Sequence, residues 1–166
     1  MNLFILDEDP VACARAHCDK HVVKMILETA QLLCTAHHVL GADLETIPYR
    51  KTHENHPCAV WVRESAGNYW WACMLALSLC REYTERYGRR HKTQDVIEWC
   101  VGREQVVSEG SIFSPLPFVQ CVPDEYKVQG DPVAAYRAYY IGEKSKIAQW
   151  NHCEPPAWWP KGDQEC

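Results

Sequence analysis

The sequence lacks any long uninterrupted apolar segment, and its first residues do not resemble a secretory signal. No stretch approaches the ~18 consecutive apolar residues that a membrane-spanning helix requires. The opening residues, MNLFILDEDP, contain no basic region, and their apolar run is too short for a signal peptide. Repeats, low-complexity tracts and β-hairpin signals are also absent. These absences predict a cytoplasmic, all-α protein with no membrane partner.

The short motifs of several enzyme classes are missing as well. The sequence has no CxxC pair, no HExxH, no P-loop, no GxGxxG and no GxSxG. Two spacings suit a zinc ion but match no recognised signature, namely Cys18-x-x-His21 and His53-x-x-His56-x-Cys58. We therefore predict no metal and no other cofactor, and a zinc-dependent hydrolase is kept as an alternative.

Cysteine and apolar residues are plentiful. The ten cysteines have no regular spacing, and several, such as Cys34, Cys73 and Cys80, fall on apolar positions of expected helices. A free thiol packs there as a small hydrophobe, so we expect reduced cysteines. With 47% hydrophobic residues, a chain of 166 residues can bury one sizeable core. The net charge of −5 argues against tight binding to long duplex DNA, although a small basic cleft remains possible.

Four segments carry helix signals. Asp9-Pro10 predicts a helix start, because aspartate caps a helix and proline fits its first turn. The expected helices cover 10–41, 57–88 with a bend at Gly67, 93–105 and 132–150, and loops are expected over 42–56 and 108–131. The prediction is a compact single domain, residues 1–166, of about four helices with long ordered loops. We expect its irregular aromatic tail, 150–166, to pack on the body through a tryptophan pair.

A row of polar side chains interrupts the apolar pattern of the first expected helix. Steps of four and three residues place six side chains on one helical face: His17, His21, Lys24, Glu28, Gln31 and Thr35. A solvated face with weak ion pairs is the alternative interpretation. Histidine is suited to proton transfer near neutral pH, and apolar neighbours suggest a groove. The predicted catalytic residues are therefore His17, Asp19, His21, Lys24 and Glu28.

The second expected helix supplies the candidate substrate-binding residues. Free N–H groups at a helix start attract anions, and an arginine beside a tryptophan could clamp a base and its phosphate. The basic segment 81–92 is the best phosphate-binding candidate in the sequence. The predicted substrate-binding residues are His53, Asn55, His56, Trp61, Arg63, Glu64, Asn68 and Arg86. In the alternative interpretation Trp61 belongs to the core, and Arg63 and Glu64 lie on the surface.

The order of these features resembles that of a known family. A short lead-in precedes a helix that carries His17, and the next helix opens at His56-Pro57. The segment EYTERYG is followed by His91, and an aromatic AYRAYY segment lies near the C-terminus. This layout is similar, over about residues 1–145, to the phage pyrimidine-dimer DNA glycosylase (endonuclease V) family and to uncharacterised tailed-phage proteins. The resemblance implies a compact all-α fold, DNA repair or modification, and a DNA or nucleotide substrate.

The resemblance also implies a mechanism. In that family the N-terminal α-amine attacks the sugar C1′ and forms a Schiff base, and a first-helix carboxylate assists. Carried over, the carboxylate is Glu28 or Asp19, with His17, His21 and Lys24 lining the site. The family exposes a threonine amine after loss of methionine, whereas residue 2 here is Asn, whose size favours retention of Met1. Lys24 offers a second amine, if burial lowers its pKa.

The sequence thus favours an enzyme that acts on a nucleic acid or nucleotide, such as a DNA base N-glycosylase/lyase. A non-catalytic phage-type module that sequesters a nucleotide or binds a host protein is an alternative. A purely structural role for the polar row is another.

Overall fold

The protein is all-helical in the part of the chain that the computed structural model describes, which is residues 1–41, 46–107, 110 and 114–160. Within these residues there are six α-helices, two short 3-10 helices and no β-strand. The all-α class is therefore confirmed. The expectation of about four helices is wrong, because each of the two long expected helices is broken into two.

The first break separates α1 (Pro10–Ala16) from α2 (Asp19–Val39). The Asp9 side chain caps α1 as expected, by accepting a hydrogen bond from the Ala12 N–H. At the other end of α1, His17 has the extended backbone angles φ −67° and ψ 134°. His17 therefore ends α1 and does not lie on α2. The predicted continuous row of six side chains on one helix is wrong at its first member.

The second break separates α3 (Pro57–Glu64) from α4 (Ala66–Tyr87). Ser65 is extended, and its hydroxyl accepts a hydrogen bond from the Asn68 N–H, which makes it the N-cap of α4. The helix is therefore not bent at Gly67, as expected, but interrupted completely at Ser65, two residues earlier. Gly88, with φ 65°, ends α4 as expected, because glycine adopts the left-handed region without steric cost.

The remaining elements are α5 (Gln94–Val101), η1 (Glu104–Val106), η2 (Asp124–Tyr126) and α6 (Pro132–Lys144). The starts of α5 and α6 agree with the expected ones, but both helices end before residues 105 and 150. Parts of the expected loops and tail, 42–45, 108–109, 111–113 and 161–166, lie outside the described residues.

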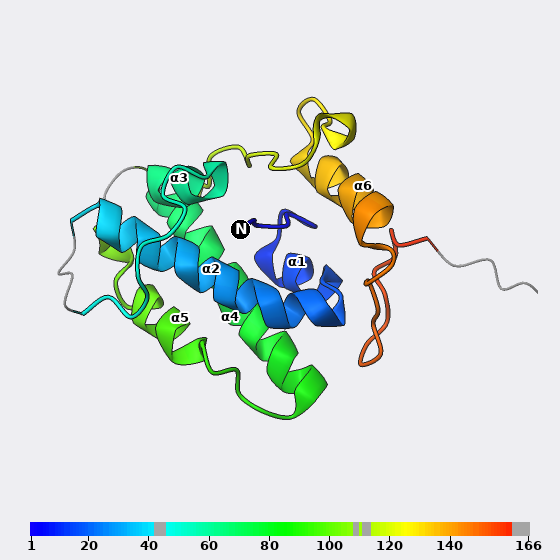
Figure 1. Ribbon diagram of the computed structural model, residues 1–166, viewed down its shortest axis with the longest axis horizontal. Helices are drawn as coiled ribbons and strands as arrows, with labels where there is room; N and C mark the ends of the chain where they lie inside the picture. The colour runs from blue at the N-terminus through cyan, green and yellow to red at the C-terminus, as the bar shows by residue number, and fades with distance from the viewer. Residues whose placement is uncertain (42–45, 108–109, 111–113, 161–166) are drawn as a thin grey trace, which may run out of the picture.

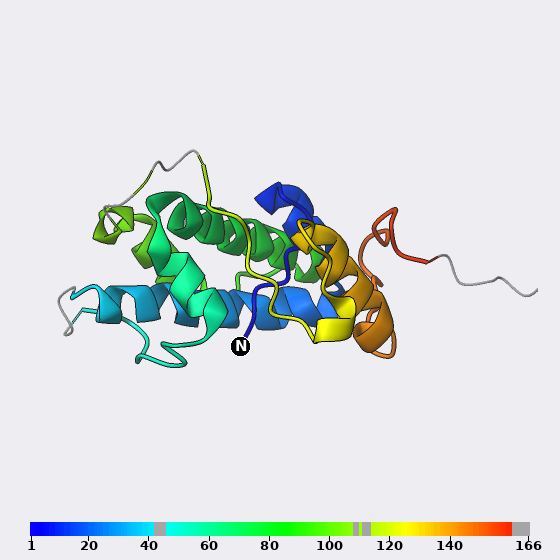
Figure 2. The ribbon, with the colours of Figure 1, turned by 90° about the horizontal axis from the view of Figure 1, so that it is seen from above.

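Helix α4 is the centre of the packing. It contacts α1, α2, α3 and α5, and α2 and α4 lie side by side along the molecule (Figures 1 and 2). The N-terminal segment runs beside α2, and its residues 3–6 are buried. In the described part of the tail, Trp158 and Trp159 pack edge-on against Tyr140 of α6. None of the helices in the described residues is long and apolar enough to cross a membrane.

Candidate functional site

The predicted catalytic residues fall into three separate environments. His17 and His21 lie in the core, Asp19 belongs to a buried ion-pair network, and Lys24 and Glu28 form a polar site at the N-terminus of the chain. The three groups differ in how deeply their side chains are buried. The spacing of the residues in steps of four and three does not reveal this difference.

His17 and His21 are enclosed on all sides. The Nδ1 atom of His21 is 2.7 Å from the Tyr140 hydroxyl, and its ring stacks on Phe4 with centroids 4.8 Å apart. The Nδ1 atom of His17 is 2.7 Å from the Cys13 carbonyl oxygen, while its buried Nε2 atom has no hydrogen-bond partner in the part of the chain that the structure describes. Burial lowers the pKa of His21 to about 4 and that of His17 to about 3. Both rings are therefore neutral near pH 7.

These histidines predict a loss of stability in mild acid. Burial also lowers the pKa of His37 to about 4. Between pH 6.5 and about 4 the histidines of the unfolded state bind protons that those of the folded state do not. Their contribution to the free energy of unfolding is therefore fully present above pH 6.5 and decreases as the pH falls. Each histidine contributes a slope of about 1.4 kcal/mol per pH unit in this window. Urea unfolding at several pH values measures the slope, and His21→Gln should reduce it. Equal slopes in both proteins would contradict the assignment.

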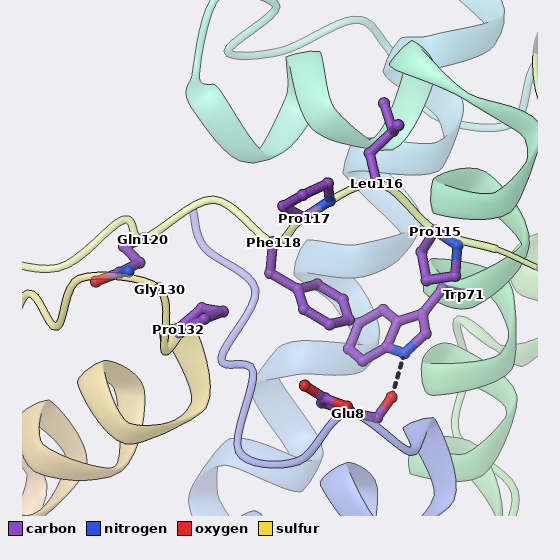
Figure 3. Close-up of a pocket in the computed structure, with 9 residues that line it drawn as sticks. All are labelled: Glu8, Trp71, Pro115, Leu116, Pro117, Phe118, Gln120, Gly130 and Pro132. Atoms are coloured by element: carbon purple, nitrogen blue, oxygen red, sulfur yellow. Dashed lines mark hydrogen bonds between the residues drawn. The ribbon is translucent and has the colours of Figure 1, made fainter.

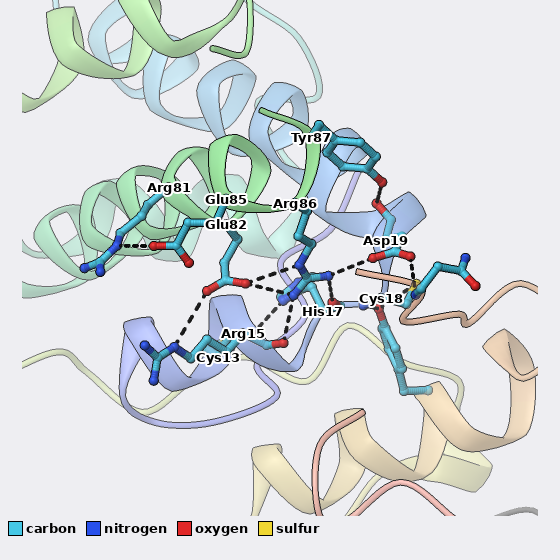
Figure 4. A network of polar contacts seen from close by, with 12 residues as sticks. Cys13, Arg15, His17, Cys18, Asp19, Arg81, Glu82, Glu85, Arg86 and Tyr87 are labelled. Atoms are coloured by element: carbon cyan, nitrogen blue, oxygen red, sulfur yellow. Dashed lines mark hydrogen bonds and ion pairs between the residues drawn. The ribbon is translucent and has the colours of Figure 1, made fainter. Parts of the chain in front are cut away.

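Asp19 and Arg86 belong to one buried network that joins α1, α2 and α4 (Figure 4). The Arg86 guanidinium donates to the carboxylates of Asp19 and Glu82 and to the carbonyl oxygens of Arg15 and His17. All five guanidinium N–H donors are thereby used. Arg86 therefore has no N–H donor left for a phosphate. Its surroundings indicate a structural role and not the predicted substrate-binding role.

Glu28 is the centre of the polar site at the N-terminus. Its side chain is 12% exposed. One oxygen, Oε2, accepts a hydrogen bond from the Asn2 N–H at 3.0 Å and lies 3.9 Å from the Met1 α-amine. The other oxygen, Oε1, is 3.1 Å from the Nζ atom of Lys24, whose side chain is 63% exposed. Two amines thus flank one carboxylate, a combination that suits amine-based nucleophilic catalysis.

His56 adjoins this site from the start of α3. Its Nδ1 atom accepts a hydrogen bond from the Cys58 N–H at 3.2 Å, so His56, and not Asn55, caps the helix. The pKa of His56 is lowered, first by burial and then by the positive N-terminal amine, and Glu28 opposes this shift. His56 is therefore within electrostatic reach of both the amine and Glu28. The sequence selected these residues separately, and the fold brings them together.

The other predicted binding residues are not gathered at one place. Trp61 is buried against Trp71 and Phe118, and its indole N–H donates to the Pro117 carbonyl oxygen. Asn68 is also fully buried, where its side chain bonds the backbone of residues 61 and 116. These two positions agree with the alternative interpretation of a core role. The remaining four have separate surroundings: Arg63 donates to the Glu54 carbonyl oxygen, Glu64 and Asn55 are exposed, and His53 bonds the hydroxyl of Thr52.

A basic groove adjoins Lys24. Its volume is about 650 Å³, and its lining residues are Val23, Lys24, Leu27, Tyr49, Tyr83 and residues 89–93. None of these lining residues is acidic. The 89–92 segment therefore remains a phosphate-binding candidate, although Arg90 is paired with Asp95 and Glu98.

A second cavity, of about 660 Å³, had no signal in the sequence. The loop at 115–118 crosses α4 there and packs Phe118 edge-on against Trp71, whose indole N–H donates to the Glu8 carbonyl oxygen (Figure 3). The lining is mostly proline and aromatic, and Glu8 is the one titratable side chain among the lining residues, so this cavity lacks the paired amines and carboxylate of the Glu28 site.

Comparison of the chain with protein-family models, with curated proteins and with solved structures gives no match. The geometry of the site is therefore the basis on which a function is proposed.

Proposed function

We propose that this protein is an enzyme that acts on DNA or a nucleotide through an amine beside Glu28, with N-glycosylase/lyase-type chemistry. The observation that carries the proposal is the pair of amines, of Met1 and Lys24, on the two oxygens of a single carboxylate. A carboxylate in this position can accept the proton of an attacking amine and return it to a leaving group.

The proposed reaction is Schiff-base formation at a deoxyribose C1′. The lone pair of the unprotonated amine forms an N–C1′ bond with the open-chain aldehyde of an abasic site. The C=O π bond breaks as the N–C1′ bond forms, and Glu28 carries one proton from the amine nitrogen to the aldehyde oxygen, which gives a carbinolamine. A second proton, taken from solvent, lets the hydroxyl leave as water, and an iminium ion remains. In this scheme the basic groove next to Lys24 holds the phosphates that flank the sugar.

The two amines have different advantages. A free α-amine has an ordinary pKa of about 7.7–8.0, so more of it is unprotonated at neutral pH than of a lysine amine. This applies if Met1, or Asn2 after loss of Met1, is the first residue of the mature protein. Lys24 is more accessible, and it lines the basic groove. Either amine would place the iminium beside Glu28.

Borohydride trapping on abasic DNA tests the proposal and identifies the amine. We expect sodium borohydride to reduce the iminium to a stable secondary amine, which links the protein covalently to an oligonucleotide. The same oligonucleotide with a tetrahydrofuran abasic analogue is the matched control, because it has no aldehyde to react. Peptide mapping by mass spectrometry should locate the adduct on Lys24 or on the first residue, and not on the exposed Lys51.

Both duplex and single-stranded oligonucleotides should be used, since the overall charge of −5 favours a short or single-stranded substrate. Absence of a covalent product, or adducts spread over many surface lysines, would contradict the proposal. Stoichiometric binding without any covalent product would favour the non-catalytic nucleotide-binding alternative.

A further inference from the structure

Three metal-binding side chains meet at the start of α3, close to but separate from the Glu28 carboxylate. The ligand atoms of His56, Cys58 and Cys121 all lie within 4.8 Å of one another. His56 and Cys58 come from the first residues of α3, whereas Cys121 comes from the loop before η2, more than sixty residues later. We propose that these three side chains form a binding site for a zinc ion.

The donor set and its dimensions suit zinc. Zinc is bound in proteins by thiolate and imidazole ligands in tetrahedral geometry. With a Zn–S bond of about 2.3 Å, two sulfur atoms of a tetrahedral site are about 3.8 Å apart. The Sγ atoms of Cys58 and Cys121 are 3.3 Å apart, so insertion of the ion requires them to separate by only about half an ångström. Hard cations such as Mg²⁺ prefer oxygen ligands, which this cluster does not supply.

The surrounding hydrogen bonds hold the cluster in place. Asn2 accepts a hydrogen bond from the Cys58 thiol at 3.3 Å and one from the Tyr136 hydroxyl at 3.2 Å, and its side-chain amide donates to the Cys121 carbonyl oxygen. The Cys121 N–H donates to the same tyrosine hydroxyl at 3.0 Å. Bonds of this kind orient metal ligands and strengthen binding.

The electrostatics of the pair favour loss of a thiol proton. Hydrogen bonds from Cys58 and Tyr136 lower the pKa of Cys121 to about 7, and the positive charge of Lys127 acts in the same direction. The pKa of Cys58 is raised, because it donates to Cys121 and is buried. Zinc would replace the thiol protons of both cysteines, so that up to two protons leave per ion and two thiolates balance the charge of the metal.

The His56 ring must change its hydrogen bond when the metal binds. A neutral imidazole has one nitrogen lone pair, and in this structure that of Nδ1 accepts from the Cys58 N–H. Coordination therefore replaces the cap of α3. The exchange is local, since α3 keeps Pro57 in its first turn.

The experiment is zinc binding by the full-length, reduced protein, without substrate. We expect native mass spectrometry to show one zinc ion per chain. With Co²⁺ as the probe, thiolate-to-metal charge-transfer absorption should appear. Replacement of a ligand, as in Cys121→Ser or His56→Gln, should weaken zinc affinity in a chelator competition by at least about 10–100-fold, the range seen for loss of even a supporting residue.

A second cysteine pair provides the matched control. Cys34 and Cys100 are buried with their Sγ atoms 3.9 Å apart, and no histidine completes a metal-binding group with them among the described residues. Cys34→Ser should therefore leave zinc affinity unchanged. Should Cys58→Ser fail to fold, Cys121→Ser still tests the site, because Cys121 is only partly buried in a loop.

Three results would overturn the proposal: no zinc retained by the reduced protein, equal losses in the site and control variants, or a Cys58–Cys121 disulfide that persists under reducing conditions. None of these measurements depends on turnover. The zinc proposal and the proposed function can therefore fail independently.

Discussion

Replacing Glu28 with glutamine should reduce borohydride-trapped product on abasic DNA by about 10²–10⁴-fold, which is the usual contribution of a positioned acid–base group. Glutamine has nearly the same shape, and its amide oxygen can still accept the hydrogen bond from the Asn2 N–H. It cannot, however, accept the amine proton. The Lys24 side chain is 63% exposed and its amine remains solvated, so loss of its pair with Glu28 should cost no more than about 0.5 kcal/mol. We expect the activity to fall while the thermal midpoint changes little.

Glu85→Gln is the control for this experiment. Glu85 is also paired at i,i+4, with Arg81, but it lies on the exposed surface of α4, away from the N-terminus. The control protein should trap DNA as well as the unmodified protein. Full trapping by Glu28→Gln would remove Glu28 from the mechanism, and an equal loss in both variants would indicate a general charge effect.

Replacing Arg86 with alanine should lower the free energy of unfolding by about 3–5 kcal/mol, the cost of breaking a buried ion pair from one side. The Arg86 side chain is 2% exposed and neutralises two carboxylates, those of Asp19 and Glu82. After the substitution both carboxylates would remain buried without Arg86, and Glu82 would keep only the exposed Arg15, at 3.7 Å. Two backbone carbonyl oxygens, of Arg15 and His17, would also lose their donors. Urea unfolding monitored by tryptophan fluorescence measures the change.

Arg81→Ala provides a matched comparison on the same helix. Arg81 also forms an i,i+4 pair, with Glu85, but its side chain is 71% exposed. We expect a change of at most about 0.5 kcal/mol, because water already solvates both charges. Similar losses in the two variants would contradict the buried-network interpretation. Activity per folded molecule of Arg86→Ala would also show whether Arg86 has any binding role beyond its structural one.

The same comparison shows why burial is difficult to deduce from the sequence. Arg81–Glu85 and Glu82–Arg86 have identical spacing and composition, and from the sequence both are ordinary surface pairs. Only the packing of α1 and α2 against α4 adds Asp19 and the two carbonyl oxygens to the second pair. A network that joins three helices has no signature within any one of them.

Helix starts were predicted well because their signals are local. Asp9-Pro10 and Asp131-Pro132 begin helices through bonds between an aspartate and the N–H groups that follow it. The breaks at His17 and Ser65 were missed because the apolar periodicity continues across them. At His17, the extended backbone is accompanied by tertiary contacts that no local pattern encodes, including bonds from Arg86 to its carbonyl oxygen and from Cys18 to the Tyr140 hydroxyl.

The sequence by itself determined the all-α class, the starts of four of the six described α-helices, and the placement of Lys24 and Glu28 one helical turn apart. Tertiary structure alone decided which polar residues are accessible: it buried His17, His21 and Arg86, and it brought the N-terminus to Glu28. It also placed Cys121 beside Cys58. The physical reason is that spacing along a helix fixes only the face on which a residue lies, whereas the chain that covers that face comes from distant parts of the sequence.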